Sequence, residues 1–210
     1  MSGLASKDNP IPTNLRFFLI RLGDWRSETR SDAEINTVHE AVPGHYLQKG
    51  LARELQPPTR LSKLIDNDAY AEGWARYAEA MAEEAKIYDS EDAKVMRRLW
   101  PARGMVVDPG LHAFHWTRQQ AVDYMVSSGH FSTEVANDYV DRTAVMPGQL
   151  TSYDTGGLEI RALRVEAQRR LGGRFDLRRF NQTILEEGVV PLRELRAHLE
   201  IWMTEELSHK

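Results

Sequence analysis

Cysteine is absent from the 210 residues of this chain. The protein therefore forms no disulfide and offers no thiolate to a metal, so any metal site must use histidine, aspartate or glutamate. Long apolar runs are also missing, because the stretch that begins at Phe17 is interrupted by Arg21, far short of the roughly 18 residues that cross a bilayer. We expect neither a disulfide-built domain nor a membrane protein.

A strong excess of charge of one sign is lacking as well. The 27 basic and 31 acidic residues leave a formal net charge of −4, which gives no general attraction to nucleic acid or to anionic lipid. The first residues are polar and contain proline, unlike a signal peptide. We therefore predict a cytoplasmic protein without a nucleic-acid or membrane partner.

Alternating β patterns and internal repeats are not found, whereas apolar residues recur at helical spacing along most of the chain. We predict an all-α fold, with residues 1–30 as an N-terminal arm and residues 31–210 as a single helical domain. The helices are expected from Ser31 to the Pro43-Gly44 pair and over residues 68–87, 90–99, 108–128, 132–143, 148–171, 177–187 and 191–207.

Two helix starts rest on capping signals. Ser31 and Glu34 have the spacing of a capping box, in which each side chain accepts from a backbone N–H that the first turn leaves free. Asp108 followed by Pro109 has the pattern of an aspartate N-cap with proline at the first helical position.

The segment His39-Glu40-Ala41-Val42-Pro43-Gly44-His45 carries the chemistry. Zinc peptidases usually present two histidines four residues apart on one helix, and a glutamate after the first histidine deprotonates the metal-bound water. Here the spacing is six, which in a regular helix leaves the side chains about 120° apart. A break at Pro43-Gly44 would bring His45 back towards His39; the alternative is a pair of incidental histidines.

A third ligand is expected on a neighbouring helix, and Glu72 follows His45 by 27 residues. Two histidines and a carboxylate leave one position open for water. The alternative is that Glu72 is an exposed helix residue that pairs with Arg76 one turn later.

Five segments in order, HEAVPGHYLQ, YAEGWARYAE, VVDPGLHAFHW, MPGQLTSYDTGGLEI and LGGRFDLRRF with GVVPLREL, resemble the C-terminal part of the bacterial "domain of unknown function 885" family. The resemblance runs from about Ser31 to Trp202. It implies a zincin-like helical domain with a distorted HExxPGH active-site helix. In it, His39, His45 and Glu72 bind Zn²⁺, Glu40 is the general base, and Trp74 and Tyr77 pack in the core around the helix of the third ligand.

Other candidates have two interpretations each. Tyr153 resembles a tyrosine that faces the metal in related helical carboxypeptidases, where it would donate to the oxyanion, or it is a buried tyrosine. His112 is a second donor or a partner of a ligand carboxylate. Asp108 caps its own helix or orients a ligand histidine, and Arg161 and Arg164 bind a substrate carboxylate or form a solvated face.

The chain departs from the family pattern at Gly104, His115, Asp154 and Asn181, where a basic residue, a glycine, a lysine and a histidine are expected. None of these positions is a predicted ligand or base. The resemblance also implies that family members are several times longer, so a partner subunit or a homo-oligomer could complete the site. The departures favour a small amide as an alternative to a peptide substrate.

Three functions are compatible with this pattern. The leading hypothesis is a zinc metallopeptidase or amidase in which Glu40 takes a proton from the metal-bound water and Tyr153 steadies the oxyanion. The alternatives are a catalytically inactive helical scaffold and an enzyme with iron or another metal on the same ligands. Replacing Glu40 by glutamine separates the first two, because only an enzyme would lose turnover.

Overall fold

The computed structural model describes residues 29–55 and 66–208, and helices form most of both ranges. The elements are α1 (Arg30–Glu40), α2 (His45–Glu54), α3 (Asp68–Glu84), α4 (Glu91–His112), α5 (Arg118–Val126), α6 (Thr133–Val145), α7 (Gln149–Leu171), the 3-10 turn η2 (Gly172–Arg174), α8 (Leu177–Glu186) and α9 (Leu192–Ser208). These residues contain no strand, so the predicted all-α class is confirmed. Within the same ranges, no helix has the length and apolar character needed to cross a bilayer.

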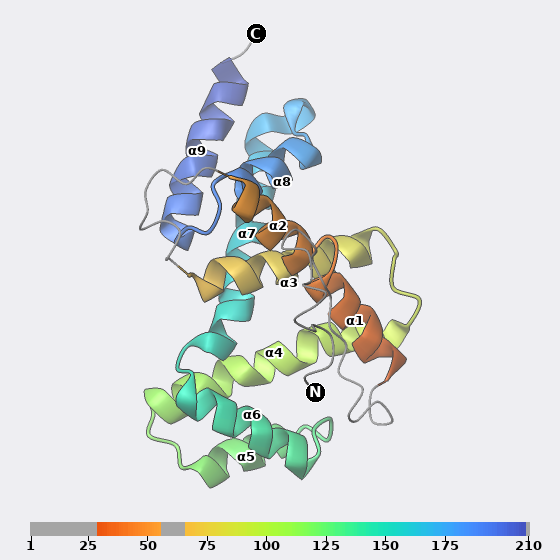
Figure 1. Ribbon diagram of the computed structural model, residues 1–210, viewed down its shortest axis with the longest axis vertical. Coiled ribbons are helices and arrows are strands. Elements are labelled where there is room, and N and C mark those ends of the chain that lie inside the picture. Colours follow the sequence, from red (N-terminus) through yellow and green to blue (C-terminus); the bar gives the residue numbers. More distant parts are fainter. Residues whose placement is uncertain (1–28, 56–65, 209–210) are drawn as a thin grey trace, which may run out of the picture.

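The long helix α7 connects the two ends of the molecule. In Figure 1, α4, α5 and α6 lie at one end, α8 and α9 lie at the other, and α3 crosses α7 between them. At this crossing a Cβ added to Gly156 would lie 1.7 Å from the carbonyl oxygen of Ala69 and 2.7 Å from Cα of Gly73. The two backbones therefore touch, and the first turns of α7 lie beside the first turns of α3.

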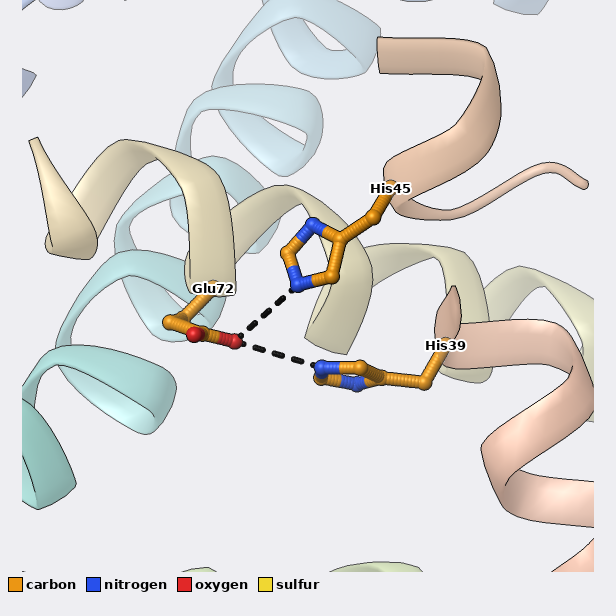
Figure 2. Close-up of side chains that lie close together, drawn as sticks. All are labelled: His39, His45 and Glu72. Atoms are coloured by element: carbon orange, nitrogen blue, oxygen red, sulfur yellow. Dashed lines mark hydrogen bonds and ion pairs between the residues drawn. The ribbon is translucent and has the colours of Figure 1, made fainter. Parts of the chain in front are cut away.

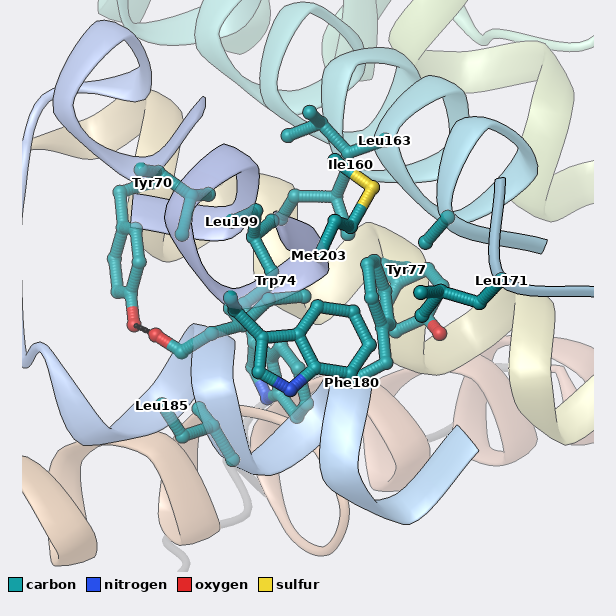
Figure 3. Close-up of a cluster of buried hydrophobic side chains, with 14 residues drawn as sticks. Tyr70, Trp74, Tyr77, Ile160, Leu163, Leu171, Phe180, Leu185, Leu199 and Met203 are labelled. Atoms are coloured by element: carbon teal, nitrogen blue, oxygen red, sulfur yellow. Dashed lines mark hydrogen bonds between the residues drawn. The ribbon is translucent and has the colours of Figure 1, made fainter. Parts of the chain in front are cut away.

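Aromatic side chains of α3 form the centre of the main core, together with apolar side chains of α7, α8 and α9 (Figure 3). Trp74 and Tyr77 are 1% and 0% exposed, which confirms that they are core residues. The hydroxyl of Tyr70 donates to the carbonyl of Ile184 at 2.8 Å, so its one polar group is satisfied. Burying side chains of this size contributes about 1.5–3 kcal/mol each, and this core fixes α3 as the platform for the site.

The N-cap of the first described helix lies two residues before the predicted one. Thr29 is the N-cap and forms a capping box with Asp32, so the box predicted at Ser31 and Glu34 is wrong. The same residue types occur two positions earlier, and the side chain of Ser31 instead hydrogen-bonds Thr29 at 2.8 Å. Glu34 accepts from the backbone N–H of Ser90 at 3.1 Å, which attaches α1 to the start of α4. Nearly all of the predicted arm, residues 1–30, lies outside the described residues.

The helices predicted over residues 90–99 and 108–128 are divided at a different place in the structure. α4 continues through Pro101 and Pro109 to His112, and the next helix begins only at Arg118. Asp108 is therefore not the cap of its own helix. Its carboxylate accepts from the backbone N–H groups of Gly148 at 3.1 Å and Thr151 at 3.3 Å, so it caps α7 from across the fold.

Candidate metal centre

The Pro43-Gly44 pair separates two helices and folds the chain back on itself. α1 ends at Glu40 and α2 begins at His45, with a cis peptide bond before Pro43. A Cβ on Gly44 would lie 1.9 Å from the carbonyl oxygen of His39, so only glycine fits this turn. The imidazole rings of His39 and His45 meet edge to face with centroids 4.8 Å apart. The predicted break is confirmed, and it brings the two histidines together.

Glu72 of α3 faces both histidines (Figure 2). Its Oε2 lies 3.2 Å from Nε2 of His39 and 3.3 Å from Nε2 of His45. Two ligand atoms that each lie about 2.0–2.1 Å from a tetrahedral zinc ion are separated by roughly 3.3–3.4 Å. Both separations from Glu72 agree with that edge length, and the three ligand atoms all lie within 4.8 Å of one another, so together they could hold a small divalent ion. The alternative pairing of Glu72 with Arg76 is not observed.

A second set of side chains binds the Nδ1 atoms of the histidines, the ring nitrogens that do not face Glu72. Nδ1 of His39 bonds Oε1 of Glu79 at 2.8 Å, and Nδ1 of His45 bonds Oε1 of Gln48 at 3.3 Å. Since carboxylates only accept, Nδ1 of His39 donates to Glu79, and Nε2 donates to Glu72 when both ring nitrogens carry protons. A metal ion would take the place of the proton on Nε2, and the hydrogen bond from Nδ1 to Glu79 would keep the ring in its orientation.

The carboxylate of Glu79 is buried and has an ion-pair partner of its own. Its carboxylate is 0% exposed and pairs with Arg76, whose Nε also donates to Asp154 at 2.8 Å. Sequence reasoning did not assign Glu79, although it follows Glu72 by seven residues and therefore lies two turns along the same helix face.

Opposite charges at the centre shift two pKa values. Burial alone would lower the pKa of His39, but hydrogen bonds to Glu72 and Glu79 raise it to about 9. Burial alone would raise the pKa of Glu72, but hydrogen bonds from His39 and His45 lower it to about 2. The carboxylate of Glu72 is therefore fully ionised at neutral pH, as a metal ligand requires.

The three predicted catalytic side chains lie in different surroundings. Glu40 is the last residue of α1, directly after His39, and is exposed. The ring of Tyr153 stacks on that of His39 with centroids 5.9 Å apart, and burial followed by the charge of Glu72 raises its pKa to about 12. His112 donates from Nε2 to the carbonyl of Thr143 at 3.0 Å, and in the described ranges no hydrogen bond or ion pair joins it to the three candidate ligands.

Two further polar residues reach the centre from α6 and α7. Nε2 of Gln149 donates to Oε1 of Glu72 at 3.3 Å and to the hydroxyl of Tyr153 at 3.2 Å. Nη2 of Arg142 donates to Oε1 of Gln149 at 3.0 Å. Neither residue was singled out from the sequence, although Gln149 belongs to the MPGQ segment on which the resemblance rests.

The remaining candidates have structural partners. Arg161 is exposed, and Arg164 pairs with Glu84 at 2.8 Å, which favours the solvated face over a substrate clamp. Asn181 accepts from the hydroxyl of Tyr77 at 2.9 Å. Gly104 lies against Leu150, whose side chain would be 3.1 Å from an added Cβ.

Comparison with known proteins gives a family and two similar structures. The model of a family described as "Bacterial protein of unknown function (DUF885)" matches residues 5–199. The crystal structure of "the putative lipoprotein from Colwellia psychrerythraea" is 34% identical with a TM-score of 0.81, over 89% of this chain and 32% of that chain. A "putative lipoprotein of unknown function from Shewanella oneidensis" is 29% identical with a TM-score of 0.71, over 80% of this chain and 31% of that chain. The chain thus spans about a third of each, and no curated protein matches it.

Proposed function

From the premise that this chain belongs to the bacterial family DUF885, whose function is unknown, we propose that it is a zinc-dependent hydrolase of peptide or small amide bonds. The observation that carries the proposal is the convergence of His39, His45 and Glu72: the carboxylate lies 3.2 and 3.3 Å from the two Nε2 atoms, close to the edge length of a zinc tetrahedron, and the three ligand atoms lie within 4.8 Å of one another. Three protein ligands leave a fourth position for water, which is the arrangement of catalytic rather than structural zinc sites.

The chain's own residues have roles that fit hydrolysis. A zinc ion at this site would act as a Lewis acid and lower the pKa of bound water. Glu40, adjacent to His39 at the solvent-facing end of α1, is the group that accepts the water proton. With its pKa raised to about 12, Tyr153 keeps its proton at neutral pH and can donate to the oxygen of the attacked carbonyl.

The ring of outer partners argues for a metal site over an idle scaffold. Burying His39 and Glu79 costs free energy that only paired, oriented contacts offset, and the contact with Glu79 turns Nε2 of His39 towards Glu72. The proposal includes the zincin-like arrangement, here with the second histidine at the start of a new helix. His112 lies on the far side of α4's last turn, where it binds the backbone of α6, so we place it in a supporting role.

Metal content provides the first test. Elemental mass spectrometry on protein purified without added metal should find about one zinc per chain, and His45→Ala should lose it. His130→Ala, which removes an exposed histidine, is the matched control and should keep the metal. Iron in place of zinc would overturn the choice of metal. Absence of any metal after zinc is offered would overturn the proposal that the protein is a metal-dependent hydrolase.

Turnover provides the second test. Glu40→Gln should bind zinc as the wild type does and lose hydrolysis of amide substrates by about 100-fold or more, whereas Glu54→Gln, which also removes a carboxylate from a nearby helix, should not. Equal turnover of Glu40→Gln and wild type would contradict the role of the base. A cytoplasmic location and a partner subunit or homo-oligomer stay predictions; the description as lipoproteins belongs to the two similar proteins.

A further inference from the structure

Arg142 lies in the last turn of α6 and turns towards the metal centre. Its Nη2 donates to Gln149 at 3.0 Å and to the hydroxyl of Tyr153 at 3.5 Å. Gln149 in turn donates to Glu72 at 3.3 Å, so a single amide group separates the guanidinium from a candidate metal ligand. The arginine is nevertheless exposed and faces solvent at the edge of the site.

This guanidinium differs from the other arginines around the site in having no carboxylate partner. Arg76, Arg97 and Arg164 all form ion pairs within the fold. Among the residues that the structure describes, none forms an ion pair with Arg142, and its Nε and Nη1 donors make no hydrogen bond. Nε and Nη1 lie on different edges of the guanidinium, so each can donate singly to a carboxylate, and such charge-assisted hydrogen bonds are stronger than neutral ones.

A purely structural role explains less of this geometry. A cation in the last turn of a helix is stabilised by the helix dipole and by the free carbonyl groups there. Arg142 instead makes both of its hydrogen bonds to side chains of α7, which are themselves in contact with Glu72 and His39. The carboxylate of Asp68 lies close enough to interact electrostatically with the guanidinium, although the two form no ion pair.

A single side-chain amide, that of Gln149, lies between Arg142 and Glu72. A peptide cut at its last bond has, in a similar way, one residue between the attacked carbonyl and the terminal carboxylate. Val145 and Met146, at the end of α6, are 77% and 44% exposed, so apolar side chains that follow Arg142 in the chain are open to solvent.

We propose that Arg142 binds the free carboxylate of the substrate's last residue. The substrates are then peptides or N-acyl amino acids that end in an apolar residue, and the site removes that residue. This inference rests on the proposed hydrolase function for the reaction. The carboxylate-binding site itself can be measured without turnover.

Paired ligands with and without the charge test the binding site. N-acetyl-leucine and N-acetyl-leucinamide are titrated into zinc-loaded and chelator-treated protein by calorimetry. We expect the acid to bind at least about tenfold more tightly than the amide in both preparations, since a charge-assisted hydrogen bond to the free carboxylate contributes more than that factor of affinity. Arg142→Ala should abolish the difference, Arg142→Lys should keep part of it, and Arg161→Ala, an exposed arginine of α7, should change nothing.

Hydrolysis of matched peptides tests the role in the reaction. The wild type should cleave a peptide with a free terminal carboxylate at least about tenfold faster, as kcat/KM, than the same peptide with a terminal amide, and Arg142→Ala should lose only this preference. Equal affinities for the acid and the amide would overturn the proposal. An equal loss of kcat/KM on both peptides in Arg142→Ala would overturn it as well. If zinc is bound and acid binds selectively while no peptide is cleaved, the hydrolase proposal fails and the carboxylate site stands.

Discussion

At the scale of single residues, His39 uses its two ring nitrogens for different purposes. Nε2 faces Glu72 and Nδ1 is bound by the buried carboxylate of Glu79. Such an outer carboxylate fixes the orientation of the ring and makes it a better ligand. We therefore expect that losing the charge of Glu79 weakens metal binding more than it destabilises the fold.

Glu79→Gln keeps the shape and one hydrogen bond of the side chain but removes its charge. We expect zinc affinity to fall by about 10–100-fold, measured by competition with a chelating dye. Glu84→Gln, which removes an exposed partner of Arg164 on the same helix, is the control and should leave affinity unchanged. Equal affinities for Glu79→Gln and the wild type would show that the outer carboxylate does not act on the metal.

At the scale of elements, the start of α7 depends on a residue of another helix. Gly148, the N-cap, provides no side chain, and Asp108 of α4 accepts the N–H groups that the first turn leaves free. This turn carries Gln149 and leads to Tyr153, so the cap also positions both side chains at the metal centre.

Asp108→Ala should lower the free energy of unfolding by about 1–2 kcal/mol, the usual cost of losing a cap, and should also reduce hydrolysis because α7's first turn is no longer held. Asp176→Ala provides the comparison, since Asp176 caps α8 through the N–H of Arg179 at 2.8 Å. Urea unfolding should give similar losses for both variants, with activity reduced only in Asp108→Ala. Similar activity in the two variants would contradict the positioning role.

At the scale of the whole molecule, the three candidate ligands join three helices. His39 lies in the last turn of α1, His45 begins α2 and Glu72 belongs to α3. Removing zinc with a chelator should therefore lower the melting temperature, because a ligand at 100 times its Kd contributes about 2.7 kcal/mol. Calorimetry with and without chelator measures the shift. His45→Ala should melt at one temperature in both conditions; an equal shift in that variant would assign the effect to the chelator.

The sequence predicts most of the fold because most of its signals are local. The helical class and the helices that became α3, α6, α7, α8 and α9 follow from apolar spacing and end signals. The same local logic fails at Asp108-Pro109, where a strong start signal lies inside α4, because the carboxylate serves a helix 40 residues away. A capping pattern does not say which helix it caps.

The site also contains residues that could be predicted from local sequence patterns and residues that could not. His39, His45 and Glu72 could be predicted as a group because motif spacing and family resemblance identify them together, and the structure places their ligand atoms within 4.8 Å of one another. Arg142 and Gln149 could not, because their role depends on where α6 and α7 lie relative to α3. Gln48 was also missed, since a glutamine next to a histidine motif has no distinctive pattern of its own.

The contact of Gly73 with Gly156 limits how this protein can diversify. Where two side chains separate a pair of helices, substitutions can widen or narrow the gap in small steps; here backbone meets backbone, and a Cβ on Gly156 would lie 1.7 Å from a carbonyl oxygen. The distance between the Glu72 and Tyr153 helices is thus already at its minimum, with no smaller residue to choose. New substrate preferences would have to arise at the rim, at residues such as Arg142 or Met146, while the crossing beneath them stays fixed.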